Sequence, residues 1–158
     1  MCICNSEYYF NSGTRYFIEK SFKKALECFN ESIKIDPIAM NYYFQGLTFA
    51  RLNNNIEAIK SFEKALNLEN EAGQEMFSNL LHSRVIGNNV YKFDILYDFA
   101  IAYKEIDKCD KALELAKNVK DIFQTNWKSA KDKDWYKQSI ENLDNLIRDC
   151  ELLINQTH

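Results

Sequence analysis

Turn-forming residues are scarce in this sequence. Its 158 residues include only 4 Gly and 1 Pro, whereas an all-β fold needs turn residues at every hairpin. The composition therefore excludes a many-turned β fold and favours helices. Intrinsic disorder is excluded as well, because hydrophobic residues make up 46% and aromatic residues 14% of the chain, which is enough to fill a continuous core. We expect one folded helical domain or one short array.

Membrane, secretory and nucleic-acid signatures are also missing. The sequence has no apolar run of about 18 residues, and its first residues lack the charged and apolar regions of a signal peptide. Its five cysteines, an odd number without a C-x-x-C pair, are not typical of a disulfide scaffold. The formal net charge of -3 indicates no basic excess. These absences predict a cytoplasmic protein with reduced thiols that binds neither membranes nor nucleic acid.

Residue patterns that carry chemistry are absent from the sequence. There is no glycine-rich phosphate loop, no G-x-S-x-G and no H-E-x-x-H. Cys2 and Cys4, with two histidines in the whole chain, are too few for a zinc site. We therefore expect no metal, no cofactor and no catalytic residue. Cys28, Cys109 and Cys150 are interpreted as buried small hydrophobes. A weaker hypothesis is an enzyme or redox sensor that uses Cys2 and Cys4.

The sequence matches itself when it is shifted by 33 residues. The six matched pairs are Tyr9 with Tyr42, Gly13 with Gly46, Tyr16 with Phe49, Ala25 with Ala58, Phe29 with Phe62 and Ser32 with Ala65. Spacings of three and four within each copy place these residues on one face of a first helix and one face of a second helix. The glycine lets the second helix approach the first closely. The first copy ends at Asp36-Pro37, since proline cannot continue a helix.

A third copy of the same spacings begins late. It comprises Leu96, Ala100, Tyr103, Ala112, Ala116 and Val119, which follow their counterparts in the second copy by 54 residues. The excess over 33 is 21 residues, about the length of one helix with its loop, and we assign this helix to residues 71–86. Either the helices simply alternate through the array or residues 71–92 are irregular. Alternation is favoured, with helices near 6–18, 21–34, 38–52, 55–68, 71–86, 92–106, 108–123 and 133–154.

The last segment has an apolar stripe that indicates a capping helix. The stripe consists of Leu143, Leu146, Ile147, Cys150, Leu153 and Ile154, which recur at helical spacing. A stack of hairpins needs a final helix that covers the apolar face of the last hairpin and turns a polar face to solvent. No comparable helix is expected before the first copy. The N-terminal face is therefore uncapped, covered by another subunit, or hydrated because Glu7 and Asn11 make it polar.

These spacings resemble the tetratricopeptide repeat, in which two antiparallel helices carry a small residue on the first helix and Ala, Phe and Ala on the second. The resemblance implies one all-α domain over 1–158, with helical hairpins stacked as a short right-handed superhelix of about eight helices. Its parts are repeat 1 at 6–38, repeat 2 at 39–70, an extra helix at 71–86, a degenerate repeat at 93–124 and a capping helix at 133–154. Ser12 and Gln45 depart from the pattern at a usually apolar position, and Asn70 replaces the terminal proline.

In proteins that this chain resembles, the first helices line a concave side that binds partners. The residues expected there are Phe10, Asn11, Thr14, Phe17, Met40, Tyr43, Phe44, Leu47, Arg51, Gln74, Phe77 and Leu81. Most are apolar or aromatic, which favours a peptide or amphipathic helix of another protein as the partner. We expect a non-enzymatic interaction module or adaptor. Alternatively, these rings belong to the core, are covered by the C-terminal helix, or are buried in a homodimer with a structural role.

Two subclasses of the family can be compared with these positions. Repeats that clamp the carboxylate tails of heat-shock chaperones use Lys and Asn on the first helix and Asn on the first helix of the second unit. The matching positions here are Phe10, Thr14 and Phe44, so that role is not expected. The three-repeat chaperones of type III secretion translocators begin with an extra helix, which is not expected here, and they remain a minor alternative.

Overall fold

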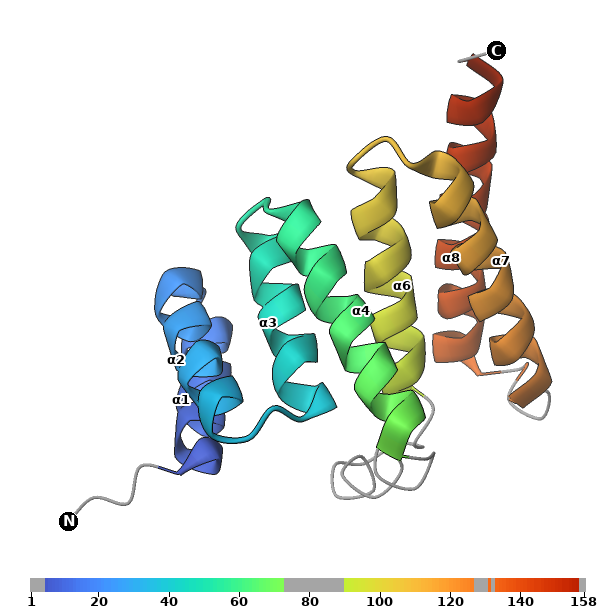
Figure 1. Ribbon diagram of the computed structural model, residues 1–158. Coiled ribbons are helices and arrows are strands. Elements are labelled where there is room, and N and C mark those ends of the chain that lie inside the picture. Colours follow the sequence, from blue (N-terminus) through green and yellow to red (C-terminus); the bar gives the residue numbers. More distant parts are fainter. Residues whose placement is uncertain (1–4, 73–89, 127–130, 132, 157–158) are drawn as a thin grey trace. The chain divides into compact units, whose positions relative to one another are not determined.

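The protein is all-helical wherever the computed structural model describes it, over residues 5–72, 90–126, 131 and 133–156. The seven helices of these ranges are α1 (Ser6–Ile18), α2 (Phe22–Ile35), α3 (Ala39–Arg51), α4 (Asn55–Ala72), α6 (Val90–Lys104), α7 (Cys109–Asn126) and α8 (Asp134–Gln156). They belong to two compact units, Met1–Asn88 and Asn89–His158. In the first unit α1–α2 and α3–α4 form successive hairpins, and in the second α8 packs against the α6–α7 hairpin (Figure 1).

The helix expected at residues 71–86 differs from the prediction at its start. Glu71 and Ala72 are the last two residues of α4, which continues beyond the predicted end at residue 68. The physical reason is local: residues 56–72 contain no glycine or proline, so neither residue type interrupts the helix at residue 68. Residues 73–86 lie outside the described part of the chain.

The three hairpins share one turn geometry. Lys20, Asn53 and Asp107 each adopt a positive φ, at 59°, 58° and 58°. The same backbone bond closes each turn: Ser21 N–H donates to Tyr16 O (2.8 Å), Asn54 N–H to Phe49 O (2.9 Å) and Lys108 N–H to Tyr103 O (3.0 Å). These positions are separated by 33 and then by 54 residues, as in the sequence repeat. The late third copy is therefore a hairpin of the same kind, with α6 as its first helix and α7 as its second.

Close contact between a glycine and a buried ring holds the first two hairpins together. A Cβ atom added at Gly13 would lie 2.7 Å from the Phe29 ring, and one at Gly46 would lie 2.7 Å from the Phe62 ring. Both rings are fully buried, at 0% exposure. The predicted role of the small residue is thus confirmed.

The third hairpin fills the corresponding space differently. Ala100 occupies the glycine position and Ala116 the phenylalanine position, and both are 0% exposed. Because no ring crosses at this level, the first helix has room for a Cβ atom. The other members of the third copy, Leu96, Tyr103, Ala112 and Val119, are also buried, at 9% exposure or less.

Helix α8 covers the open side of the second unit. Leu143, Leu146 and Cys150 of its predicted stripe are buried, at 0%, 5% and 0% exposure, whereas Leu153 is 38% exposed and does not belong to the core. Leu153 lies near the end of the 23-residue helix, which is longer than the 18-residue α7 on which it packs. Three ion pairs add to this packing: Lys104–Asp149 (2.7 Å), Lys117–Glu151 (2.9 Å) and Lys120–Asp144 (2.5 Å).

Candidate functional site

A cluster of aromatic rings joins α1, α2 and α3. Phe44 of α3 is at its centre, with ring centroids 5.2 Å from Phe10, 6.5 Å from Phe17 and 5.7 Å from Phe29. The Phe10 and Phe17 rings meet Phe44 edge-on, which is a favourable geometry for aromatic pairs. Phe29 is fully buried, but Phe10, Phe17 and Phe44 are only half-buried. These three rings therefore pack on one another and still present part of their surface to solvent.

Helical register brings further apolar side chains to the same surface. Thr14 lies between Phe10 and Phe17 on α1, while Met40 and Leu47 flank Phe44 on α3. All three are half-buried. We call these six residues the α1–α3 surface: Phe10, Thr14, Phe17, Met40, Phe44 and Leu47.

Polar side chains form the rim of the α1–α3 surface. Asn11 and Arg51 are exposed, and the Thr14 hydroxyl donates a hydrogen bond to the backbone carbonyl of Asn11 at 2.9 Å. Within the described residues no carboxylate forms an ion pair with Arg51. The Arg51 guanidinium is thus able to meet an acidic group of a bound molecule.

The remaining predicted binding residues do not belong to this surface as described. Tyr43 is only 4% exposed and packs against Phe62, with ring centroids 6.1 Å apart. It points into the second hairpin, so its placement on an open partner-binding face was wrong, and truncating it would damage the core. Gln74, Phe77 and Leu81 lie outside the described residues.

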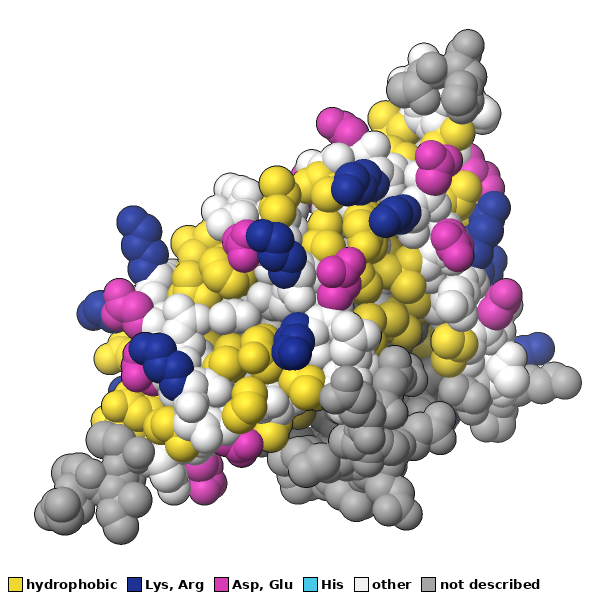
Figure 2. All heavy atoms as spheres, in the orientation of Figure 1, with side chains coloured by type: hydrophobic (Ala, Val, Ile, Leu, Met, Phe, Trp, Pro, Cys, Tyr) yellow, Lys and Arg dark blue, Asp and Glu magenta, His cyan; other side chains and the backbone are white. Residues whose placement is uncertain are grey.

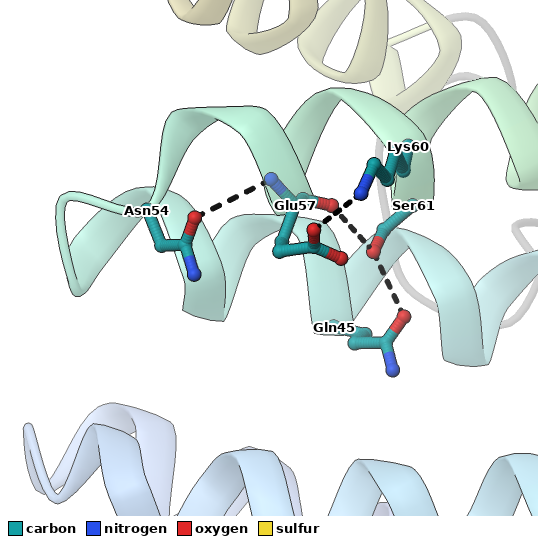
Figure 3. A network of polar contacts seen from close by, with 5 residues as sticks. All are labelled: Gln45, Asn54, Glu57, Lys60 and Ser61. Atoms are coloured by element: carbon teal, nitrogen blue, oxygen red, sulfur yellow. Dashed lines mark hydrogen bonds and ion pairs between the residues drawn. The ribbon is translucent and has the colours of Figure 1, made fainter.

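A polar chain crosses the interface between the two repeats and explains an irregularity of the sequence. Gln45, at a position where the repeat usually has an apolar residue, accepts a hydrogen bond from the Ser61 hydroxyl at 2.8 Å (Figure 3). Its amide group also donates to Asn30 Oδ1 at 2.8 Å. The Ser61 hydroxyl also lies 2.9 Å from the Glu57 carbonyl oxygen, so its single proton is shared between two acceptors. Gln45 therefore links α2, α3 and α4, a role that sequence reasoning missed although the departure at this position was its signal.

The described cysteines are not alike. Cys150 is fully buried, and burial is the main cause that raises its thiol pKa, followed by the nearby Cys109. Cys28 and Cys109 are only half-buried, so their interpretation as buried hydrophobes was wrong. Burial also raises the pKa of the Cys28 thiol, with the Glu27 carboxylate as the next cause. Cys2 and Cys4 lie outside the described residues.

Neither metal chemistry nor a membrane span is evident in the described part. No group of three His, Cys, Asp or Glu side chains there could hold a metal ion. No described helix is both long and apolar enough to cross a membrane. On the face drawn in Figure 2, Lys and Arg side chains are interspersed with Asp and Glu, and hydrophobic side chains form patches between them.

The hairpins, the turns and the glycine–ring contacts together define a helical-hairpin repeat protein. The family model of the tetratricopeptide repeat matches residues 6–38 and 41–71. These two segments of the chain thus resemble the tetratricopeptide repeat, close to where the sequence predicted repeats 1 and 2. No curated protein matches the sequence.

Solved structures of similar fold include tetratricopeptide-repeat (TPR) domains and MamA. The first TPR of Spaghetti (RPAP3), bound to the HSP90 peptide SRMEEVD, is 12% identical, with a TM-score of 0.66 over 96% of this chain and 94% of that one. The TPR2B domain of yeast Sti1, in a pHsp70 complex, is 17% identical, with a TM-score of 0.61 over 89% and 96%. MamA is 19% identical, with a TM-score of 0.60 over 96% and 70%. These likenesses confirm the predicted fold class of stacked antiparallel helical hairpins.

Proposed function

We propose that this chain is a protein-interaction module, without chemistry of its own, that binds an apolar peptide or amphipathic helix of another protein on the α1–α3 surface. The observation that carries the proposal is the half-buried state of Phe10, Phe17 and Phe44. A partner that covered about 100–200 Å² of apolar area there would gain roughly 2.5–5 kcal/mol.

Fold relatives support an interaction role of this kind. The Spaghetti (RPAP3) domain holds an HSP90 peptide, and the yeast Sti1 domain is in a complex with pHsp70. In this chain, Phe10, Thr14 and Phe44 occupy the positions at which the clamp for chaperone tails has Lys and Asn. The partner proposed here is therefore mainly apolar, and Arg51 at the rim accommodates one acidic group beside the apolar side chains.

Selection from a random peptide library on the intact chain tests this proposal. We expect the selected peptides to be amphipathic, with large apolar residues at helical spacing, and the heptapeptide SRMEEVD to bind at least about tenfold more weakly. Binding is measured by fluorescence anisotropy with the wild type and with Thr14→Lys, which places a charge beside Phe10 and Phe17. Thr14 is half-buried and its hydroxyl bond is exposed, so the fold is expected to remain.

The matched control is Lys137→Thr, a change at an exposed position of α8. We expect Thr14→Lys to weaken binding at least about tenfold, a loss of about 1.4 kcal/mol, and the control to leave it unchanged. Circular dichroism establishes that both variants are folded. Equal binding by both variants, or selection of peptides that bind through a terminal carboxylate, would contradict the proposal.

A further inference from the structure

No described helix covers the outer face of α1 in the way that α2 covers the corresponding face of α3. Positions 8 and 15 of α1 correspond to positions 41 and 48 of α3 by the 33-residue repeat. The first helix of the second repeat, α3, packs on α2. On this helix Asn41 and Thr48 are buried, with 1% and 0% of their surface exposed. Tyr8 is 56% exposed, and Arg15 is exposed as well. The first repeat therefore presents a stacking face that the second repeat buries.

Four residues form a stripe along this outer face. Tyr8, Asn11, Arg15 and Ile18 follow one another at spacings of three, four and three, the spacing at which one helix packs along another. Ile18 is 79% exposed, more than any other large hydrophobic residue that is described as exposed. An apolar residue thus stands at each end of the stripe and a polar residue at each of the two middle positions.

This pattern is complementary to itself when two copies of α1 run antiparallel. A two-fold axis near Gly13 sets Tyr8 of one copy against Ile18 of the other, and Asn11 against Arg15. Each contact occurs twice, as two-fold symmetry requires. The apolar pairs exclude water at both ends, and the Asn11 side-chain oxygen accepts a hydrogen bond from the Arg15 guanidinium between them. A parallel pair would instead oppose the two Arg15 cations.

We infer that the outer stripe of α1 is a homodimer interface, and that its partner is the same stripe of a second copy of this chain. The inference uses other rings than the proposed function, because Phe10 and Phe17 point about 120–140° away from the mean direction of the stripe. Asn11 borders both surfaces, and so does Ile18, which lies one helical turn from Thr14. One helix face buries less than the roughly 1,200–2,000 Å² of a stable interface. The dimer is accordingly weak and forms reversibly at high protein concentration.

Sedimentation velocity of the intact chain between about 5 and 500 μM tests this inference. The wild type is expected to shift from monomer to dimer within this range, and Ile18→Lys to weaken association at least about tenfold. The matched control is Ile35→Lys, since Ile35 is a 51% exposed isoleucine on α2 that lies outside the stripe. The Ile35→Lys variant is expected to dimerise as the wild type does. A strictly monomeric wild type, or equal effects of the two variants, would overturn the interface.

Mixing two complementary variants tests the antiparallel register. Tyr8→Glu and Ile18→Lys are each expected to be monomeric alone, and their equimolar mixture is expected to regain dimer, because residue 8 of one chain faces residue 18 of the other. A mixture that stays monomeric, although each single variant has lost association, would overturn the register. Both positions are exposed, and circular dichroism confirms the folded state of each variant before mixing.

Discussion

Replacing Gly46 by alanine is expected to destabilise the protein, although alanine is the better helix former. The added Cβ would lie 2.7 Å from two carbon atoms of the Phe62 ring and 3.2 Å from a third. Phe62 is 0% exposed and is held by Tyr43, so its ring has no free space to enter. Overpacking of this kind costs about 1–3 kcal/mol, against about 1 kcal/mol gained in helix propensity.

The net expectation for Gly46→Ala is a loss of up to about 2 kcal/mol in the free energy of unfolding, measured by urea denaturation with circular dichroism. In the background of Phe62→Leu, where the ring is gone, the same change is expected to stabilise by up to about 1 kcal/mol. The matched control is Ala100→Gly in the third hairpin, where the native residue already has a Cβ atom. This change should lower the free energy of unfolding by about 1 kcal/mol. Stabilisation by Gly46→Ala in the wild-type background would refute the close approach of the two helices.

Three further predictions follow from local geometry. Lys20→Gly is expected to stabilise by about 0.5–1 kcal/mol in urea denaturation, because Lys20 has a φ of 59° that glycine adopts without strain. Asn41→Leu is expected to destabilise by about 1–3 kcal/mol in the same assay, since the buried Asn41 amide donates to the Asp36 carbonyl at 2.7 Å. Lys104→Met is expected to raise the pKa of Asp149 in a carboxyl ¹³C NMR titration, because the hydrogen bond from Lys104 is the main cause that lowers it.

The sign of the pH effect follows from that lowered pKa. The ion pair of Asp149 contributes to the docking of α8 above the ordinary carboxyl pKa of 3.8, and the contribution is lost as the pH falls through the lowered pKa of the folded state. Lys117→Met, which removes a different ion pair of α8, should leave the titration of Asp149 unchanged. An Asp149 pKa that did not move in Lys104→Met would contradict the pairing.

The other two predictions have equally close controls. Glu19→Gly, one residue before Lys20 and at a φ of −72°, should not stabilise, because glycine offers no relief there. Asn67→Leu, at an exposed position of α4, should change the free energy of unfolding by less than about 0.5 kcal/mol. If Asn67→Leu and Asn41→Leu had the same effect, the bond from Asn41 to Asp36 would carry no stability.

Sequence periodicity predicted most of the fold because the repeated residues meet one another directly. The pairing of Gly46 with Phe62 and the matching turns at Lys20 and Asn53 are local consequences of a 33-residue spacing. The start of a helix at residue 71 was wrong, because no glycine or proline separates residue 68 from residue 71 and α4 continues through both.

The site was harder to predict than the fold, because neighbouring residues on a helix differ by about 100° in direction. Tyr43 and Phe44 are consecutive, yet Tyr43 points into the second hairpin and Phe44 toward α1. A sequence pattern does not show, to within one residue, where the buried face of a helix ends and its exposed face begins. The hydrogen bonds of Gln45 were equally invisible, because Asn30 and Ser61 are brought to it only by the packing of three helices.

Mapping of a bound peptide by NMR tests the central claim of an apolar docking surface most directly. A peptide selected on the intact chain is titrated into ¹⁵N-labelled and aromatic ¹³C-labelled protein. We predict that the largest shift changes, and contacts between peptide and protein protons, involve Phe10, Phe17, Phe44 and Leu47. Shift changes confined to α7 and α8, or peptide contacts made only by charged residues, would contradict the account.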